Sequence, residues 1–172
     1  MGDGKRAPRP AWIEGDVAFI PLTKGYVARL DAADLPEVSG WLWNALEERR
    51  KSDGHLYTVY ARRANSILLH RVIMRAPKEM KVDHISGDGL DNRRSNLRLA
   101  TPSQNQFNKR RSVANTSGFK GVSWISEHRK WKAAIRHSGR TDFLGYFQTA
   151  EEAAQAYANA SLKIHGQFGR VQ

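Results

Sequence analysis

The chain has 172 residues, and its 28 Lys and Arg against 17 Asp and Glu give a formal net charge of +11 and a pI of about 10.3. This positive excess predicts a polyanionic partner. The lack of cysteine excludes a disulfide framework and a Cys-ligated zinc site, and no apolar run approaches the roughly 20 residues of a membrane span.

The first ten residues, M-G-D-G-K-R-A-P-R-P, contain basic side chains and no apolar core segment. They therefore predict a loose basic arm rather than a secretory signal. Together with the missing cysteines, this composition fits a protein of a reducing cytoplasm.

Short alternating elements are expected in the part of the chain that follows the arm. Strand patterns there are bounded by Gly, Asp and Pro, and one apolar segment has the length of a short helix that Pro77 would end. In chain order we expect two strands within residues 16–30 with a turn at 23–25, a helix at 31–38 and a strand at 56–63. Residues 67–74 could form a helix or a strand, and we favour a helix.

The middle of the chain predicts a strand, a polar loop, a second strand and a helix. The strands are residues 81–85 and 97–99, and the loop between them is rich in Gly, Asp and Asn. Thr101 and Pro102 have the residue types of an N-cap and a first helical position. A ββα unit is therefore expected over residues 81–111.

The C-terminal part predicts three strands followed by one amphipathic helix. Thr149 and Glu152 form a capping-box pattern at the start of that helix. We expect strands at residues 121–125, 131–137 and 142–147, and a helix at 149–164 that buries Ala153, Ala156, Tyr157, Ala160 and Ile164.

Taken together, these elements predict an α+β fold with two domains. The first, residues 11–111, contains the ββα unit, and the second, residues 118–172, is a small three-stranded antiparallel sheet packed on one helix. Residues 1–10 form the arm, and residues 112–117 have the composition of a linker.

The chemistry of the ββα unit rests on one carboxylate, one imidazole and two amides. Asp83 and the amide oxygen of Asn105 are hard ligands of the kind that a divalent cation prefers. His84 is suited to accept a proton from water near neutral pH. Its ring needs an acceptor on the other nitrogen, which a carbonyl of Asn96 or of the backbone could supply.

Four segments carry a resemblance to a known family. They are L-H-R at 69–71, V-D-H-I-S-G-D at 82–88, D-N-R-R-S-N-L-R at 91–98 and Q-N-Q-F-N at 104–108. They resemble the HNH (ββα-metal) nucleases, in particular the homing endonucleases of phages and introns. The resemblance implies that His84 is the general base, that Asn96 orients it, and that Asp83 and Asn105 bind Mg²⁺ or Mn²⁺.

Other roles were open for the neighbouring polar residues. Asn92 is an alternative to Asn96 as the residue that orients His84. His70 lies in an apolar run, where a core position is more common than a catalytic one. Asp88 and Asp91 have the positions of loop-capping residues rather than metal ligands.

The C-terminal part resembles a second family. K-G-V at 120–122, W-K-A-A-I-R at 131–136, F-L-G-Y-F at 143–147 and T-A-E-E-A-A-Q-A-Y at 149–157 resemble the DNA-binding domain of plant ethylene-response factors (APETALA-type). In that family the sheet enters the major groove. Ser123 and Phe143 replace the family's Arg and Trp, so the plant target sequence does not carry over.

Alternation along the strand at 131–137 predicts one basic face and one face against the helix. The basic residues of the loop, helix and sheet are expected to contact DNA. The resemblance implies contacts from Lys120, Trp124, Lys132, Arg136 and Arg140 of the C-terminal domain. The other predicted DNA-binding residues are Arg93, Arg94, Asn108, Lys109, Arg110 and Arg111.

The sequence therefore predicts a metal-dependent, site-directed endonuclease of double-stranded DNA. One catalytic motif in each chain predicts a nick by a monomer, or a double-strand break by a DNA-induced dimer. The homing-type resemblance implies the cytoplasm of a bacterial or phage-infected cell. The rival interpretations are a DNA-binding regulator with an inactive nuclease unit and a basic RNA-binding protein.

Overall fold

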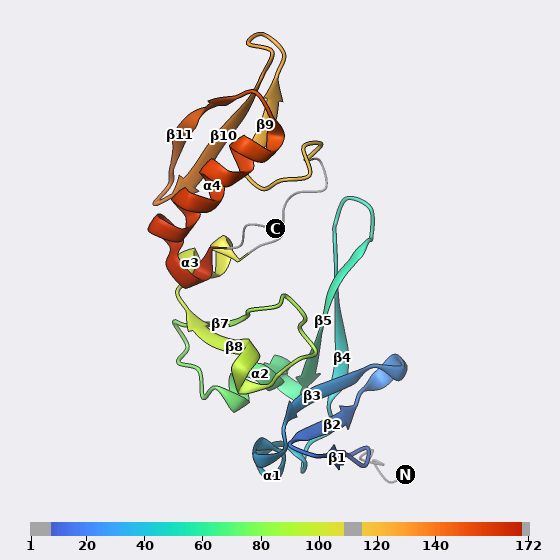
Figure 1. Cartoon of the computed structure of the whole chain (residues 1–172). Helices are drawn as coiled ribbons and strands as arrows, with labels where there is room; N and C mark the ends of the chain where they lie inside the picture. The colour runs from blue at the N-terminus through green and yellow to red at the C-terminus, as the bar shows by residue number, and fades with distance from the viewer. Residues whose placement is uncertain (1–7, 109–114, 170–172) are drawn as a thin grey trace. The chain divides into compact units, whose positions relative to one another are not determined.

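A computed structural model describes residues 8–108 and 115–169 and has an α+β fold (Figure 1). The chain divides into two compact units, Met1–Thr101 and Pro102–Gln172. The predicted linker at 112–117 lies half outside the described residues, and that domain boundary stays a prediction. Among the described residues, no helix has both the length and the apolar character needed to cross a membrane.

Short strands and two α-helices build the described part of the first unit. Its three antiparallel sheets have the orders β1-β2-β3, β4-β5-β6 and β7-β8. The elements are β1 (Trp12–Glu14), β2 (Val17–Pro21), β3 (Val27–Asp31), α1 (Leu35–Val38), β4 (Asn44–Arg49), β5 (Leu56–Arg63), β6 (Ile67–Leu68), α2 (Leu69–Ile73), β7 (Lys81–His84) and β8 (Leu97–Ala100).

The segment at 67–74 differs from the expected single helix. Its first two residues form β6, which pairs with the end of β5, and α2 begins only at Leu69. The cause is the tight turn before it, in which Asn65 and Ser66 both have a φ of 58° and reverse the chain onto β5. β1 and β4 were not expected, because neither segment has a clear strand pattern of its own.

One hydrophobic core joins the sheets of the first unit. Trp43 is 1% exposed and its indole N–H donates to the carbonyl of Val38 at 2.9 Å. Leu69 of α2 and Leu97 of β8 are buried in the same cluster as the inner residues of β2, β3 and β5. The strand pair β7-β8 is therefore anchored through Leu97 to the rest of the unit.

The second unit has the expected sheet and helix. Its elements are α3 (Pro102–Phe107), β9 (Val122–Ile125), β10 (Lys130–His137), β11 (Arg140–Phe147) and α4 (Ala150–His165), and the sheet order is β11-β10-β9. The predicted capping box of α4 is confirmed, since Glu152 N–H donates to the Thr149 hydroxyl at 3.2 Å and the Glu152 carboxylate accepts from Thr149 N–H.

The buried face of α4 is rotated from the predicted one at its C-terminal end. Ala153 and Tyr157 are buried as expected, and the face then continues through Ser161 and His165. Ile164 is 38% exposed. The prediction for Ile164 was wrong because the buried residues follow steps of four from Ala153 to His165. Each such step turns about 40° round a helix of 3.6 residues per turn, which rotates the buried face away from Ile164.

Gly121 is required where the chain enters β9 beside α4. Its φ is +73°, and a Cβ at this position would collide with the ring of Tyr157 and lie 2.7 Å from the carbonyl oxygen of Ala134. We expect Gly121→Ala to destabilise the second unit by about 1–3 kcal/mol or more, because backbone strain and steric overlap add. Urea unfolding measures the change. Gly139→Ala is the matched control, since it has a φ of +79° with nothing within 4 Å of the added Cβ.

Candidate active site and DNA-binding surface

The two-stranded sheet β7-β8 presents the predicted carboxylate and imidazole. Asp83 pairs with Arg98 across the sheet and His84 pairs with Leu97. Both Asp83 and His84 are only 6% exposed. A charged and a titratable side chain at adjacent buried positions require partners, and these come from the loop between the two strands and from Arg98.

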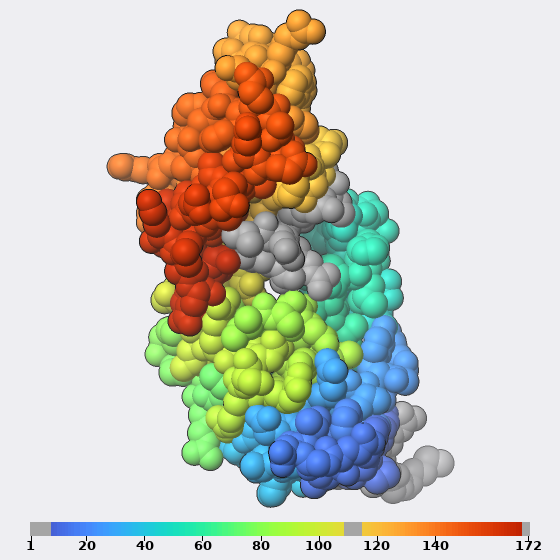
Figure 2. All heavy atoms as spheres, viewed as in Figure 1, coloured from blue at the N-terminus to red at the C-terminus, as the bar shows by residue number. Residues whose placement is uncertain are grey.

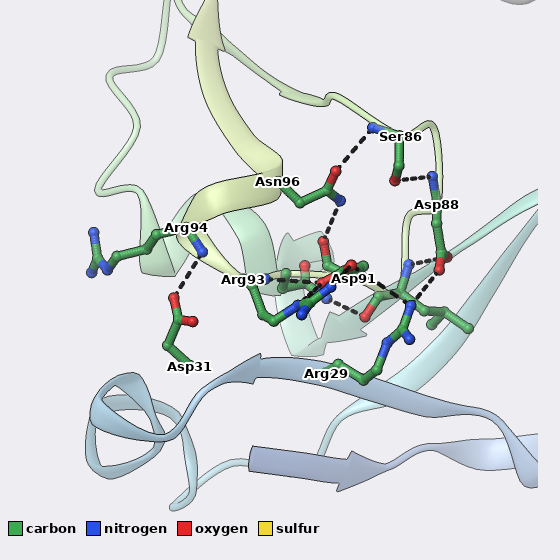
Figure 3. A network of polar contacts seen from close by, with 10 residues as sticks. Arg29, Asp31, Ser86, Asp88, Asp91, Arg93, Arg94 and Asn96 are labelled. Carbon is green, nitrogen blue, oxygen red and sulfur yellow. Dashed lines mark hydrogen bonds and ion pairs between the residues drawn. The ribbon is translucent and has the colours of Figure 1, made fainter. Parts of the chain in front are cut away.

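Asn96 closes that loop (Figure 3). Its side-chain Oδ1 accepts from Ser86 N–H at 2.9 Å, and its Nδ2 donates to the carbonyl of Asp91 at 2.8 Å. Its own carbonyl accepts from Ile85 N–H at 2.9 Å. Both ends of the amide therefore brace the loop backbone, so these bonds do not provide the predicted direct contact with His84.

The loop is also held against β3. Arg29 N–H donates to the carbonyl of Leu90 at 2.8 Å, and Asn92 N–H donates to the carbonyl of Arg29 at 2.7 Å. The guanidinium of Arg29 pairs with Asp88 at 2.8 Å (Figure 3). In the space-filling view the green segment around residues 80–100 adjoins the blue N-terminal segment (Figure 2).

Arg93 and Arg94 pair with carboxylates within the same unit. Arg93 forks onto Asp91 with distances of 2.8 and 2.6 Å, which lowers the pKa of that carboxyl. Arg94 pairs with Asp34 at 2.7 Å, and its backbone N–H donates to Asp31. Both arginines were predicted from the sequence to contact DNA. In the structure neighbouring carboxylates balance their charge, and the two ion pairs hold the loop in place.

The amide beside the imidazole of His84 belongs to Asn92. Asn92 is fully buried, and its Nδ2 donates to the carbonyl of Leu90 at 3.0 Å. Its Oδ1 accepts no hydrogen bond of ordinary geometry from the described residues. The amide nevertheless lies close to the imidazole of His84, and hydrogen bonding between the two side chains raises the pKa of His84. Burial has the larger, opposite effect and lowers the pKa of His84. The geometry favours Asn92 over Asn96 for the direct contact.

Asp83 is half of a buried ion pair. Its Oδ2 accepts from Nε of Arg98 at 2.8 Å and from Nη2 at 2.6 Å, and the two side chains are only 7% and 12% exposed. Within residues 8–108 and 115–169 no group of three or more His, Asp and Glu side chains has the arrangement of a metal site. A cation here would have few protein ligands, which suits Mg²⁺, an ion that keeps several waters.

The other predicted metal ligand lies on α3, in the second unit. Asn105 is half-buried there. The end of α3 is fixed by Phe107, whose ring stacks on His165 with centroids 3.8 Å apart and whose carbonyl accepts from the ammonium of Lys120 at 2.6 Å. Asn108 is buried, so its side chain offers little surface to DNA. Lys109, Arg110 and Arg111 lie outside the described residues.

Comparison with known proteins identifies the family of the segment that contains these residues. The HNH endonuclease family profile matches residues 68–107, which include Asp83, His84, Asn96 and Asn105. Protein 3.8 of Escherichia phage T7 is 36% identical over 96 residues, which cover 56% of this chain and 78% of the phage protein. The chain belongs to the HNH endonuclease family.

Two further relatives of this HNH endonuclease extend the comparison. An uncharacterized HNH endonuclease of Acanthamoeba polyphaga mimivirus is 42% identical over 106 residues, covering 58% of this chain and 54% of the viral protein. An AP2-like ethylene-responsive transcription factor of Oryza sativa subsp. japonica is 46% identical over 52 residues, covering 29% of this chain and 8% of the plant protein. No solved structure matches the chain.

The sheet of the second unit has the expected two faces. Ala133 and Ile135 of β10 are fully buried on the α4 side, and Arg136 is exposed, as is Arg140 at the start of β11. Lys132 is half-buried. Trp124, on β9, is 45% exposed and contacts Trp131 with ring centroids 5.2 Å apart. The exposed arginines are available to contact DNA, as predicted. Trp124 pairs with Trp131, which alternates with the buried Ala133 and Ile135, so the register places the Trp124 side chain of the HNH endonuclease on the α4 face of the sheet rather than on the basic one.

Tyr146 lies on the same face as Lys132, and its ring contacts His128. Both rings are exposed, and neither was predicted from the sequence to bind DNA. Tyr146 pairs with Lys132 across the sheet and is 41% exposed. Its ring contacts Phe143 and His128 with centroids 4.9 and 4.6 Å apart. Simple alternation would have grouped Tyr146 with Leu144, which packs on the core, because the register shift in β11 between Phe143 and Gly145 is what brings Tyr146 and Phe143 to one face. His128 lies in a turn that carries no strand pattern.

His70 makes the HNH endonuclease sensitive to acid. Its ring is 5% exposed, and burial lowers its pKa from 6.5 to about 3. Between these values the unfolded chain binds a proton that the folded chain does not, so stability is complete above about pH 6.5 and falls as the pH decreases toward 3. Each unit of pKa difference corresponds to about 1.4 kcal/mol. Urea midpoints at about pH 7.5 and about pH 5 should therefore differ less for His70→Phe than for the wild type.

Proposed function

We propose that this HNH endonuclease hydrolyses one phosphodiester of double-stranded DNA at the site around His84, and that the C-terminal unit selects the position. The observation that carries the proposal is a buried imidazole next to a buried carboxylate, on a strand pair whose loop is braced by Asn96 and by β3. Such bracing holds a proton acceptor in one place, as general-base catalysis requires.

His84 is the proposed proton acceptor. Burial lowers its pKa, so the imidazole is neutral near pH 7 and can remove a proton from water. The resulting hydroxide attacks phosphorus in line with the 3′ oxygen, which leaves. The products carry a 5′-phosphate and a 3′-hydroxyl. Asn92 is the amide at the imidazole, and Asn96 contributes by holding the loop on which Asn92 lies.

Asp83 and Asn105 are the proposed residues that hold a divalent cation, Mg²⁺ or Mn²⁺, in a ββα-metal arrangement. Both supply oxygen atoms, which such ions prefer. When bound, the cation supplies stabilisation of negative charge on the phosphate and on the leaving oxygen. Arg98 already balances the charge of Asp83, so the carboxylate must be shared between the guanidinium and the ion.

The C-terminal sheet is the proposed DNA-binding surface. The exposed arginines and aromatic rings of its outer face suit contact with phosphates and base edges. The plant relative is described as a transcription factor, which supports a DNA-binding role for this unit. The motif resemblance supports a homing-type enzyme. One catalytic set in each chain supports a nick by a monomer, or a cut of both strands by a DNA-induced dimer.

The test is cleavage of supercoiled plasmid and of a random duplex library after removal of metal with a chelator. Wild-type protein should cut when Mg²⁺ or Mn²⁺ is added, and the nicked product should be resealed by a DNA ligase, which requires a 5′-phosphate and a 3′-hydroxyl. His84→Ala should not cut under the same conditions. Equal cutting by both proteins, or cutting with the chelator present, would contradict the proposal.

A DNA-binding regulator with an inactive nuclease unit is the second candidate. The buried Asp83–Arg98 pair favours it, because a carboxylate that is neutralised by a guanidinium attracts a cation less strongly. This candidate predicts salt-sensitive DNA binding with no cleavage by either protein in any metal. The plasmid assay together with a gel-shift assay distinguishes the two.

A further inference from the structure

The rings of His70, Tyr60 and His84 come from three separate elements and contact one another. The ring of His70, from α2, lies 4.9 Å from that of His84 with an interplanar angle of 85°. The ring of Tyr60, from β5, lies 5.6 Å from His84 at 39° and 5.4 Å from His70 at 73°. Each distance is within the range in which edge-to-face and tilted aromatic pairs attract each other.

Tyr60 is itself held in place by the active-site loop. A Cβ built on Gly89 would lie 2.6 Å from the ring of Tyr60 and 2.5 Å from the carbonyl oxygen of Val59. The loop backbone at Gly89 therefore lies directly against β5, and the ring of Tyr60 has little room to move on that side.

His70 is held by the core and by the chain that leads into β7. Its neighbours Leu69 and Ile73 on α2 are 0% and 1% exposed. Arg71, the next residue of the helix, donates to the carbonyl of Met80 at 2.8 Å, immediately before β7 begins. The position of α2 is thus tied both to the core and to the strand that carries His84.

We propose that His70 and Tyr60 are positioning residues that hold the imidazole of His84 in the orientation needed to accept a proton from water. The inference rests on the proposed function of His84. Neither residue is required to bind DNA or metal in this role. Their rings restrict rotation of the His84 side chain from two directions, and the amide of Asn92 lies at the same imidazole.

In this role His70 acts through the shape of its ring and not through its nitrogens. The cleavage rates of two variants, His70→Phe and His70→Ala, therefore test the role. His70→Phe retains an aromatic ring but removes both nitrogens. His70→Ala removes the ring and leaves space beside His84. If packing positions His84, Phe should retain most of the activity, and Ala should lower kcat by a factor on the order of 10–100, the size expected of a misplaced catalytic group.

The experiment measures single-turnover cleavage and DNA affinity for the full chain carrying His70→Phe, His70→Ala, Tyr60→Phe or Tyr60→Leu. Val72→Ala is the matched control, since Val72 lies on the same helix and packs on the core. Rates are corrected for the folded fraction by circular dichroism. The ¹⁵N shifts of the His84 imidazole provide a second measurement that does not depend on activity.

We expect His70→Ala and Tyr60→Leu to have a lower kcat, unchanged DNA affinity and altered His84 nitrogen shifts. We expect His70→Phe and Tyr60→Phe to retain most of the wild-type kcat and the wild-type His84 shifts. A loss in His70→Phe as large as in His70→Ala would overturn the proposal, because it would assign the effect to a nitrogen of His70. A loss in Val72→Ala of equal size would also overturn it. If wild type cuts and His84→Ala does not, the proposed function stands whichever way these variants behave.

Discussion

His84→Ala is expected to lower the rate of DNA cleavage by a factor on the order of 10²–10⁴, the usual contribution of a positioned general base. His84 is buried on β7, next to the carboxylate of Asp83 and against the rings of Tyr60 and His70. Removing the imidazole leaves water with no acceptor for its proton, whereas the C-terminal binding surface is unaltered. Single-turnover rates and DNA affinity should therefore respond differently.

His55→Ala provides the matched control for this loss. His55 is an exposed histidine in the turn between β4 and β5, and its side chain has no role in the site. It should cleave at the wild-type rate. A His84→Ala rate within threefold of wild type, with both proteins folded, would refute His84 as the base.

Arg98→Met is expected to destabilise the first unit by about 3–5 kcal/mol, the usual cost of leaving one partner of a buried ion pair without the other. Arg98 and Asp83 are 12% and 7% exposed and meet at 2.6 Å. The methionine fills most of the space, so the loss reports removal of the guanidinium from beside the buried carboxylate of Asp83 rather than a cavity. Urea unfolding at neutral pH measures the effect.

Two controls separate this effect from a general loss of surface charge. Lys24→Met breaks a pair with Glu47 in which the lysine is 61% exposed, and it should cost about 1 kcal/mol or less. Asp83→Asn combined with Arg98→Met should recover part of the lost stability. Mg²⁺ should stabilise Arg98→Met more than wild type, because the cation then replaces the guanidinium beside Asp83. An Arg98→Met protein as stable as wild type would show that the pair is not buried in solution.

Local pattern was sufficient to predict most of the secondary structure. β5, β7, β8 and the three strands of the second unit lie within one or two residues of their predicted bounds, because alternation and flanking turn residues are local properties of the chain. β4 was missed because its charged residues, such as Glu47 and Glu48, form a strand only by pairing with β5. The last turn of α4 was misassigned at Ile164 because the buried face follows steps of four residues and rotates along the helix.

The candidate site was only partly predictable from sequence. Asp83, His84, Asn96 and Asn105 were identifiable because their spacing within short motifs is characteristic of a family. The partner of Arg94 was not, since Asp34 is 60 positions away in the sequence and comes into contact only through packing. The same applies to the ring of Tyr60 beside His84.

By itself the sequence determined the residue types available for chemistry, the positive charge, and the order of strands and helices, since these depend on composition and on neighbours within a few positions. Only the tertiary structure decided which groups those residues meet. It committed the amide of Asn96 to the loop, brought Asn92 and two rings to His84, and paired Asp83 with Arg98. The reason is physical: a buried polar group must find its partner wherever the packed chain supplies one, however distant that partner is in sequence.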